Sequence, residues 1–494
     1  MREACGVFGV YAPGKPVAQL TFDGLYALQH RGQESAGMAV SDGEALTVVK
    51  DMGLVTTVFD ERTVSCLPGD LAIGHTRYST TGASEWRNAQ PVFRAVGRAG
   101  FALGHNGNLT NTTQLAEQAG MLPGVVASDS DLVAELLSLR IPAPALDSAG
   151  EGPEGAPGGA DPLAVVDDAL EDALREVLPL VEGAFSFVVV DASHLVGVRD
   201  PTGLRPLCLG RLGPPEAAEG WVLASETPAL DIVGATFVRE IEPGEMVVID
   251  GKGVRSERLF AAERIDPHLC IFEFVYFARP DSRLCGREVH GARRRMGELL
   301  AAEAPVDADL VMGVPESGVP AAEGFARKSG IPHGQGLVKN RYIGRTFITP
   351  GQAARDAGVR RKLNPLRENI AGKRIVVVDD SIVRGTTQRA VVRMLREAGA
   401  AQVHLRISSP PLAWPCFYGI DIPDRDQLVA ARLSVPEIAE FLNVDSLAYL
   451  SLDNLVRAID ADAGFCTACL TGQYPVPVPL RAGHRGDQPA ATRS

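Results

Sequence analysis

Residues 374–386 read Arg-Ile-Val-Val-Val-Asp-Asp-Ser-Ile-Val-Arg-Gly-Thr, and a second threonine follows at Thr387. The β-branched run from Ile375 to Val378 is typical of a buried parallel strand. The polar turn after it leads into a predicted helix from Thr386 to Glu397, whose first backbone amides are free to bind an anion. The sequence therefore predicts a strand, a turn and a helix that together form a phosphate site.

Two adjacent carboxylates, Asp379 and Asp380, follow the predicted strand. Because carboxylates do not bind phosphate, the pair indicates a partner that is cationic or carries hydroxyl groups, such as Mg²⁺, a ribose, or both. A plain acidic surface turn is the alternative. The phosphate site is favoured because Gly385, Thr386 and Thr387 supply a flexible backbone, a helix cap and hydroxyl donors.

This stretch resembles the diphosphoribose-binding signature of the type I phosphoribosyltransferases. Residues 336–347, Gly-Leu-Val-Lys-Asn-Arg-Tyr-Ile-Gly-Arg-Thr-Phe, are similar to the mobile basic loop that closes over the substrate in that family. A solvated basic loop is the alternative, although it would expose three apolar side chains. The resemblance implies that the following residues contact substrate: Lys339, Arg341, Asp379, Asp380, Ser381, Arg384, Gly385, Thr386 and Thr387.

The turn at residues 314–318, Val-Pro-Glu-Ser-Gly, follows a predicted strand that begins at Leu310. It is expected beside the phosphate site, at the carboxyl edge of the sheet where open α/β folds bind ligands. The resemblance implies that Ser317 joins Asp379 and Asp380 around Mg²⁺. An ordinary strand-to-helix turn is the alternative, because Pro, Ser and Gly are common in turns.

Four motifs in the first half of the chain predict a different chemistry. They read Cys-Gly-Val-Phe-Gly-Val (5–10), Leu-Gln-His-Arg-Gly-Gln-Glu-Ser-Ala-Gly (28–37), Gly-His-Thr-Arg-Tyr-Ser-Thr (74–80) and Gly-His-Asn-Gly-Asn (104–108). Together they resemble the class II glutamine amidotransferases, in which an amino-terminal cysteine is the nucleophile and its own α-amine is the base. An α-amine has a pKa of about 8, so it can take a thiol proton near neutral pH.

Cys5 can act in this way only if the residues before it are removed, because an internal amide nitrogen is not a base. The sequence therefore predicts that residues 1–4 are a propeptide. They are too short and too polar for a signal peptide. A start codon upstream of Met1 is also compatible with the sequence.

The resemblance implies individual roles in this half. Arg77 is expected to pair with the α-carboxylate of glutamine through two guanidinium contacts. Asn106, through its side-chain amide, and Gly107, through its backbone N–H, are expected to form the oxyanion hole. Asp129 is expected to bind the substrate ammonium, with Asp131 as the competing candidate. An Asn-Gly pair alone is most often a hairpin turn, so its assignment depends on the other motifs.

The chain contains eight cysteines and no sign of secretion, so a disulfide framework is not expected. Cys466 and Cys469 have a metal-ligand spacing that needs two more thiolates from elsewhere. The candidates are Cys270, before Ile-Phe-Glu-Phe-Val-Tyr-Phe-Ala-Arg-Pro-Asp-Ser, and Cys416, within Pro-Cys-Phe-Tyr-Gly-Ile-Asp. The remaining cysteines other than Cys5 are expected to be small buried side chains: Cys66, Cys208 and Cys285.

Both cysteine contexts resemble the cluster-bearing branch of the glutamine phosphoribosylpyrophosphate amidotransferases. The resemblance implies that Cys270, Cys416, Cys466 and Cys469 hold a 4Fe-4S cluster with a structural and oxygen-sensing role. Zinc is the alternative, because four thiolates also suit tetrahedral zinc.

Length and charge agree with a large enzyme. A chain of 494 residues exceeds a single core and indicates at least two domains. A net charge of −13 argues against a nucleic-acid surface. Since no run of about 18 apolar residues occurs, no transmembrane helix is expected, and the predicted location is the cytoplasm.

The predicted fold combines an α+β and an α/β domain. Residues 5–245 are expected to form an α/β/β/α sandwich of the amino-terminal-nucleophile amidotransferase type, and residues 246–480 a type I phosphoribosyltransferase domain with a parallel sheet. The boundary is placed after the turn-rich residues 241–245. Residues 142–162 are dense in Gly, Pro, Ala and Asp and are predicted to be a disordered insertion, and residues 481–494 a flexible tail.

The predicted elements of the sandwich include strands at Phe101–Leu103 and Ala184–Val190 and a helix from about Ser128 to Leu139. In the second domain, strands are predicted at Leu310–Val314, Ile375–Val378 and Val403–Ile407.

The resemblance covers roughly residues 5–475 and implies one overall reaction. Glutamine is hydrolysed through a Cys5 thioester, ammonia travels internally, and it displaces pyrophosphate from phosphoribosyl pyrophosphate to give 5-phosphoribosylamine, the first committed step of purine synthesis. Purine nucleotide feedback inhibitors and a homotetramer are also implied. The alternatives are another class II amidotransferase, which would need a different second domain, and a non-catalytic regulator, which would not need the Cys5 motifs.

Overall fold

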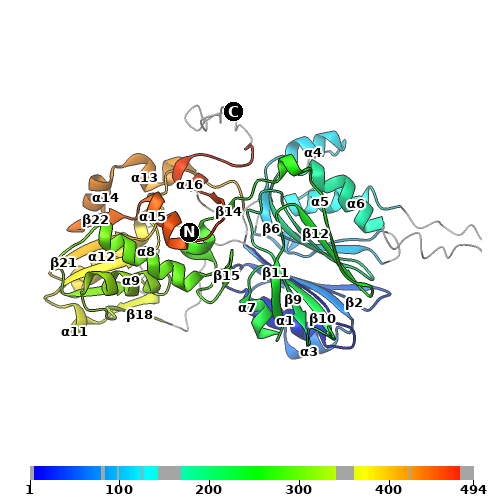
Figure 1. The fold of residues 1–494 in the computed structure, drawn as a ribbon, viewed down its shortest axis with the longest axis horizontal. Coiled ribbons are helices and arrows are strands. Elements are labelled where there is room, and N and C mark those ends of the chain that lie inside the picture. The colour runs from blue at the N-terminus through cyan, green and yellow to red at the C-terminus, as the bar shows by residue number, and fades with distance from the viewer. Residues whose placement is uncertain are drawn as a thin grey trace, which may run out of the picture.

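The computed structural model describes residues 5–78, 84–96, 99–122, 124, 126–142, 169–340, 361–420, 422 and 424–478. The predicted propeptide, the predicted insertion beyond Pro142 and the predicted tail lie outside the described residues, as does Arg341 with the rest of its loop. The described chain forms two domains side by side (Figure 1). Within the described residues, no helix has the length and apolar character needed to cross a membrane.

Two stacked antiparallel sheets form the first domain. The first has the strand order β11-β9-β10-β1-β4-β2-β3 and the second β13-β12-β8-β7-β6-β5. Bounds in the first sheet are β1 (Gly6–Tyr11), β2 (Ser35–Ser41), β3 (Leu46–Met52), β4 (Leu71–Arg77), β9 (Cys208–Leu212), β10 (Gly220–Ala224) and β11 (Thr236–Glu240). Those in the second are β5 (Val92–Arg94), β6 (Phe101–Leu109), β7 (Gly183–Val190), β8 (Leu195–Arg199), β12 (Glu245–Asp250) and β13 (Gly253–Arg258).

Helices cover the outer face of each sheet, which confirms the predicted α/β/β/α sandwich. One apolar core lies between the sheets and includes Val7, Ile73 and Val188. A separate core joins each sheet to its helices. The first sheet carries α1 (Val17–Ala27), α2 (Val55–Val58), α3 (Glu61–Ser65) and α7 (Pro228–Ile232), and the second α4 (Thr112–Gln118), α5 (Asp129–Ser138) and α6 (Ala169–Val177).

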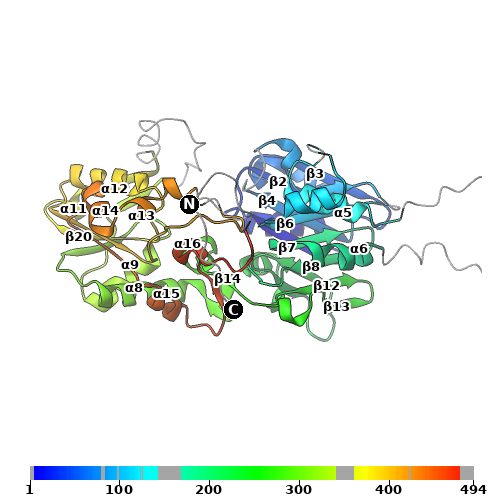
Figure 2. The ribbon, with the colours of Figure 1, turned by 90° about the horizontal axis from the view of Figure 1, so that it is seen from above.

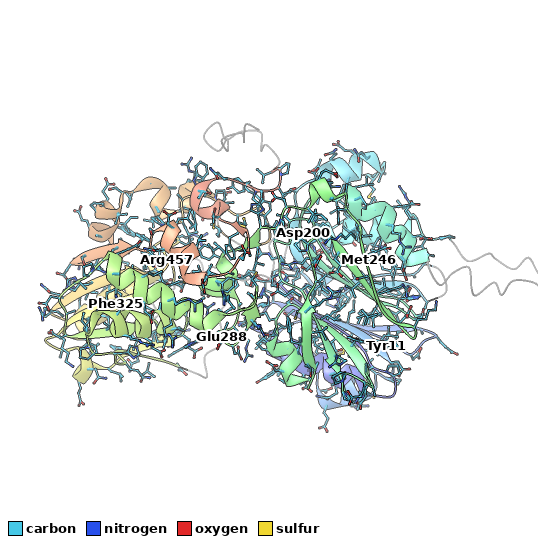
Figure 3. The ribbon with its side chains drawn as sticks, in the orientation of Figure 1. Tyr11, Asp200, Met246, Glu288, Phe325 and Arg457 are labelled. Carbon is cyan, nitrogen blue, oxygen red and sulfur yellow. The ribbon has the colours of Figure 1, made fainter. Side chains whose placement is uncertain are left out.

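The predicted boundary at residues 245 and 246 is wrong, because the first domain continues through β12 and β13. Strand β12 pairs with β8 on one side and β13 on the other. Its side chains alternate: Met246 and Val248 pack against the helices of the second sheet, whereas Val247 and Ile249 pack between the sheets. Figure 3 shows Met246 within the first domain. The turn-rich residues 241–245 only join β11 to β12 within one sandwich.

The second domain is built on a parallel sheet of order β17-β20-β21-β22. Its bounds are β17 (Leu310–Gly313), β20 (Arg374–Asp379), β21 (Gln402–Ile407) and β22 (Ser446–Tyr449). Helices α8 (Val289–Glu303), α9 (Val319–Ser329) and α15 (Leu452–Ile459) pack on one face, and α12 (Thr386–Glu397) and α14 (Val435–Leu442) on the other. The predicted strands and the predicted helix from Thr386 to Glu397 are therefore confirmed.

Shorter elements complete the second domain and connect it to the first. They are β14 (Leu269–Cys270), a π-helical turn (Glu273–Phe277), β15 (Arg283–Leu284), β16 (Arg287–Glu288), β18 (Leu337–Lys339), β19 (Leu363–Pro365), α11 (Arg367–Ile370), α13 (Val429–Arg432), β23 (Phe465–Cys466) and α16 (Ala468–Thr471). The last described segment returns between the domains, where α16 and β14 lie (Figure 2). There Tyr418, Cys466 and Val476 form a small apolar core with Ala184 and Leu204 of the first domain.

Helices α8 and α9 approach each other closely at two glycines. A Cβ atom added at Gly297 would lie 1.8 Å from the carbonyl oxygen of Ala321. A Cβ atom at Gly324 would lie 1.9 Å from the carbonyl oxygen of Arg294. Since both obstructing atoms are backbone, neither can turn away.

We expect Gly297→Ala to lower the free energy of unfolding by roughly 1–3 kcal/mol, because the two helices must move apart. The control is Gly291→Ala on the same helix, where the nearest atom to the added Cβ is the end of the Arg295 side chain at 3.5 Å. That change should be neutral or stabilising by up to about 1 kcal/mol. Urea unfolding of both variants measures the difference, and equal stabilities would contradict the packing.

Candidate active sites

The first candidate site is centred on Cys5, which directly precedes β1 in the middle of the first sheet. Its side chain is buried, and Sγ donates to the carbonyl oxygen of Tyr78 at 3.4 Å. Burial raises the pKa of the thiol, and the positive charge of nearby Arg77 offsets part of this rise. In the intact chain Cys5 is therefore held as a neutral thiol, and Arg77, the last residue of β4, lies near enough for its charge to act on this thiol.

The side chain of Asn106 on β6 is fully buried, and neither its oxygen nor its nitrogen has a hydrogen-bond partner among the described residues. Buried polar atoms without partners are rare and costly, at about 1–3 kcal/mol each. An amide in this state is well suited to receive a ligand. The next residue, Gly107, has φ 152°, and a Cβ atom there would lie 2.0 Å from the carbonyl oxygen of Ala184. Only glycine fits.

Asp129 and Asp131 lie in the first turn of α5 but face different surroundings. Asp129 accepts from the backbone N–H groups of Ser130 (2.8 Å) and Leu109 (3.2 Å), and its charge raises the pKa of Cys5. Asp131 forms an ion pair with Arg94 at 2.6 Å. Of the two candidates, Asp129 is thus the one whose charge acts on the nucleophile.

Sequence reasoning missed the buried histidines that support this site. The ring of His105 lies 3.0 Å from the Ser130 hydroxyl through Nδ1, and Nε2 of His75 lies 2.9 Å from the carbonyl oxygen of His105. Burial lowers the pKa of His75 to about 3, so it is neutral at physiological pH. Both histidines belong to the motifs at residues 74–80 and 104–108. Nothing in the sequence distinguishes residues that support the site from residues that carry out the reaction. Arg31 was missed for the same reason.

The second candidate site lies at the carboxyl end of β20. Asp379 and Asp380 are buried, and the backbone N–H of Asp380 donates to Asp379 Oδ1 at 3.0 Å. Gln388 of α12 donates to the other oxygen of Asp379 at 3.1 Å. Burial and the charge of Asp380 raise the pKa of Asp379 well above its usual range. Two carboxylates held this way are well placed for a cation.

The predicted phosphate turn connects β20 to α12. Gly385 precedes α12 with φ 74°, a left-handed conformation that favours glycine, and Thr386 and Thr387 begin the helix. The hydroxyl of Ser381 donates to Asp380, and Arg384 donates to Gln427 at 2.7 Å. The backbone amides at the start of α12 therefore follow the acidic pair, as predicted.

The turn containing Ser317 lies against the end of β20. The backbone N–H of Val314 donates to the carbonyl oxygen of Val378 at 2.9 Å, and a Cβ atom on Gly318 would lie 2.3 Å from that same oxygen. Nζ of Lys339 is 3.4 Å from the Glu316 carboxylate of this turn. Ser317 and Lys339 thus belong to the same edge of the sheet as the acidic pair.

The four predicted metal-binding cysteines converge where the last described segment meets both domains. Cys270 on β14 is in register with Cys466 on β23. Burial raises the pKa of all four thiols, and the positive charge of the buried Arg205 offsets part of this shift at Cys270, Cys416 and Cys466. All four are free thiols. Among the described residues, no group of three or more His, Cys, Asp or Glu side chains is arranged to hold a metal ion.

The other cysteines only partly follow the prediction. Cys208 is buried and Cys285 half-buried, but Cys66 is exposed, because it ends the surface helix α3.

Comparison with known proteins covers nearly the whole chain. The family model "Phosphoribosyl transferase domain" matches residues 289–408. The amidophosphoribosyltransferase of Mycobacterium leprae is 55% identical over 97% of this chain and 83% of its own length. That of Bacillus subtilis is 44% identical over 97% of this chain and 95% of its own. The chain belongs to the amidophosphoribosyltransferase family.

Solved structures agree with this family. The Bacillus subtilis glutamine phosphoribosylpyrophosphate amidotransferase, complexed with ADP and GMP, matches with a TM-score of 0.83 and 43% identity over 97% of this chain and 98% of that one. A second match, also with a TM-score of 0.83, is described as the allosteric regulatory enzyme of purine biosynthesis. The predicted family and fold class are confirmed. The iron-sulfur branch and the individual residue roles stay predictions.

The buried thiol of Cys5 predicts a pH dependence that can be measured. In molecules that retain residues 1–4, we expect iodoacetamide to modify Cys5 at least about 10-fold more slowly than the exposed Cys66 at pH 7, since a raised pKa leaves little thiolate. The Cys5 rate should still be rising at about pH 9. Peptide mass spectrometry over pH 6–10 separates the two cysteines and the two amino-terminal forms. A Cys5 rate that levels off below pH 8 would contradict a raised pKa.

Proposed function

We propose that this chain catalyses the amidophosphoribosyltransferase reaction. Glutamine is hydrolysed to glutamate and ammonia, and the ammonia displaces pyrophosphate from C1 of phosphoribosyl pyrophosphate to give 5-phosphoribosylamine, the first committed step of purine nucleotide synthesis. The observation that carries the proposal is 55% identity to a curated amidophosphoribosyltransferase over 97% of the chain. Similarity restricted to the phosphoribosyltransferase region would not distinguish this reaction from those of other phosphoribosyltransferases.

In the first half-reaction, Cys5 is the nucleophile after residues 1–4 are removed. The new α-amine takes the thiol proton, and Sγ attacks the side-chain carbonyl carbon of glutamine. The α-ammonium returns this proton to the amide nitrogen, the C–N bond breaks, ammonia leaves, and water then hydrolyses the resulting thioester to glutamate. Asn106 and the backbone N–H of Gly107 stabilise the oxyanion. The unpartnered amide of Asn106 supports this role, because a bound oxyanion would supply the missing acceptor.

Glutamine itself is held at its other end by two opposite charges. Arg77 pairs with the α-carboxylate and Asp129 with the α-ammonium. The charges of both residues act on Cys5, which supports a common pocket. Because Asp131 already forms an ion pair with Arg94, we assign the binding of the ammonium group to Asp129 and not to Asp131.

In the second half-reaction, the edge of the parallel sheet binds phosphoribosyl pyrophosphate. Gly385, Thr386 and Thr387 hold phosphate at the amino terminus of α12, with Ser381 and Arg384 in the same turn. Lys339 and Arg341 bring positive charge to the pyrophosphate. Ser317, Asp379 and Asp380 would hold Mg²⁺, which neutralises the charge of the leaving pyrophosphate. The donor set fits, because Mg²⁺ prefers oxygen ligands and a cation would offset both the burial and the charge of Asp380 that raise the pKa of Asp379.

Cys270, Cys416, Cys466 and Cys469 would hold a 4Fe-4S cluster with a structural and oxygen-sensing role. Cys270, Cys416 and Cys466 lie near enough to the buried guanidinium of Arg205 for their charges to act on it, and this positive charge fits an anionic cluster with thiolate ligands. Zinc is the alternative, and metal analysis separates the two.

Purine nucleotides are proposed as feedback inhibitors, since the Bacillus subtilis relative was solved with ADP and GMP. The homotetramer stays a prediction from the family.

We expect the two half-reactions to be separable by mutation. Cys5→Ala should abolish glutamine-dependent synthesis but keep ammonia-dependent synthesis. The double variant Asp379→Ala and Asp380→Ala should lose both syntheses while a low glutaminase activity persists. Assays of glutamate and pyrophosphate release on both proteins test this. Parallel loss of both syntheses in Cys5→Ala would count against two separate sites, and unchanged affinity of the double variant for phosphoribosyl pyrophosphate would refute the acidic pair's role.

Metal analysis tests the cysteine site. Protein purified without oxygen should be brown and contain about four iron atoms per chain. Cys469→Ser should lose the colour and the iron, whereas the control Cys285→Ser should keep both. Exposure to air should bleach the protein and increase its sensitivity to proteases, because the cluster joins segments that are far apart in sequence. A colourless protein with stoichiometric zinc would show that the four cysteines bind zinc and not an iron-sulfur cluster.

A further inference from the structure

Arg31, in the loop after α1, contacts the nucleophile directly. Its Nε donates to the carbonyl oxygen of Cys5 at 3.2 Å. Its side chain is fully buried. A buried arginine that donates to one particular backbone oxygen fixes that oxygen strongly, because the donor is charged and no water competes with it.

The rest of the guanidinium is held by two carboxylates, one from each domain. Nη1 donates to Glu226 of the first domain at 2.8 Å, and Nη1 and Nη2 both donate to Glu273 at 2.7–2.9 Å. Glu273 begins the π-helical turn whose neighbours Phe272 and Phe274 pack in the core of the second domain. All three nitrogens of Arg31 are therefore engaged, so its orientation is determined.

The π-helical turn is itself held in place from the second domain. Arg293 of α8 donates through Nε to the carbonyl oxygen of Phe274 and through Nη2 to that of Ala278, both at 2.8 Å. The side chain of Arg205 adds a contact to Glu273 at 3.3 Å. Glu273 is thus presented to Arg31 from a fixed backbone.

The proposed chemistry requires a fixed position for Cys5, and the hydrogen bond from Arg31 provides it. Once residues 1–4 are removed, Cys5 is the first residue of the chain, and chain ends fray unless they are tied down. The ladder of β1 begins only at Gly6. The hydrogen bond from Arg31 holds the backbone carbonyl group of Cys5, the terminal residue itself. This group is attached to the same Cα atom as the α-amine and the thiol side chain that react.

We infer that Arg31 is a positioning residue for the Cys5 nucleophile and that Glu273 of the second domain holds Arg31 in its working orientation. The inference rests on the proposed role of Cys5. It makes glutamine hydrolysis dependent on a residue of the second domain. A purely structural ion pair would instead support both half-reactions equally.

Arg31→Lys is the sharpest test, because lysine keeps the charge for Glu226 and Glu273 but loses the Nε that reaches Cys5. We expect kcat for glutamine hydrolysis to fall roughly 10- to 100-fold with little change in KM, since misplacing a reacting group by about 1 Å costs this much. Ammonia-dependent synthesis should stay within about twofold. Glu273→Gln, which keeps the size and removes the charge, should show the same split.

The matched control is Arg279→Lys, at the same interface. Arg279 pairs with Asp281 at 2.7 Å and has no hydrogen bond to Cys5, so both activities should stay near those of the parent protein. Ammonia-dependent synthesis, measured on the same samples, reports whether the second domain is folded and active.

Two results would overturn the inference. One is unchanged kcat for glutamine in both Arg31→Lys and Glu273→Gln. The other is loss of both activities in parallel, or failure of both variants to fold, which would make the role structural. Cys5→Ala is assayed alongside: if it retains glutaminase activity, the proposed nucleophile is wrong, whereas if it loses that activity and Arg31→Lys does not, only the positioning role fails.

Discussion

Four charged side chains, Arg31, Arg205, Glu226 and Glu273, lie fully buried where the two domains meet. Burying charge is expensive unless each charge is paired and hydrogen-bonded, and here two guanidinium groups meet two carboxylates. Removing any one partner would leave an uncompensated charge inside the protein. This network therefore constrains how the domains can dock, and it includes Arg31, whose Nε donates to the carbonyl oxygen of Cys5.

Both candidate sites contain buried polar groups whose hydrogen-bonding capacity or charge a bound ligand would satisfy. The amide of Asn106 is buried without a partner, and the carboxylates of Asp379 and Asp380 are buried side by side. Each arrangement destabilises the free protein, since the groups are desolvated without full compensation. The cost is consistent with preorganisation, in which binding groups are fixed before the substrate arrives.

The segment carrying Cys416 also reaches the first domain. The side chain of Asn108 donates to the carbonyl oxygen of Phe417 at 2.8 Å, and Arg205 donates to that of Tyr418 at 2.7 Å. Gly419 has φ 94°, and a Cβ atom there would lie 2.8 Å from the carbonyl group of Gly107. The cysteine region and the strand of Asn106 are thus packed together without room for a side chain between them.

The sequence by itself determined the local elements and the chemistry of the motifs. The run at Ile375–Val378 and the following turn predicted strand, turn and helix correctly. β-branched residues favour a strand, and a glycine followed by two threonines favours a turn into the start of a helix. It also named Cys5 and Arg77, whose charge acts on the Cys5 thiol in the structure, and Asn106, whose buried amide has no partner among the described residues. What it could not decide was where Met246–Ile249 would pair, since apolar alternation suits a strand in either domain. Only the tertiary structure showed that Arg31 contacts Cys5 and Glu273, because these partners are 26 and 242 positions apart and no local pattern links them.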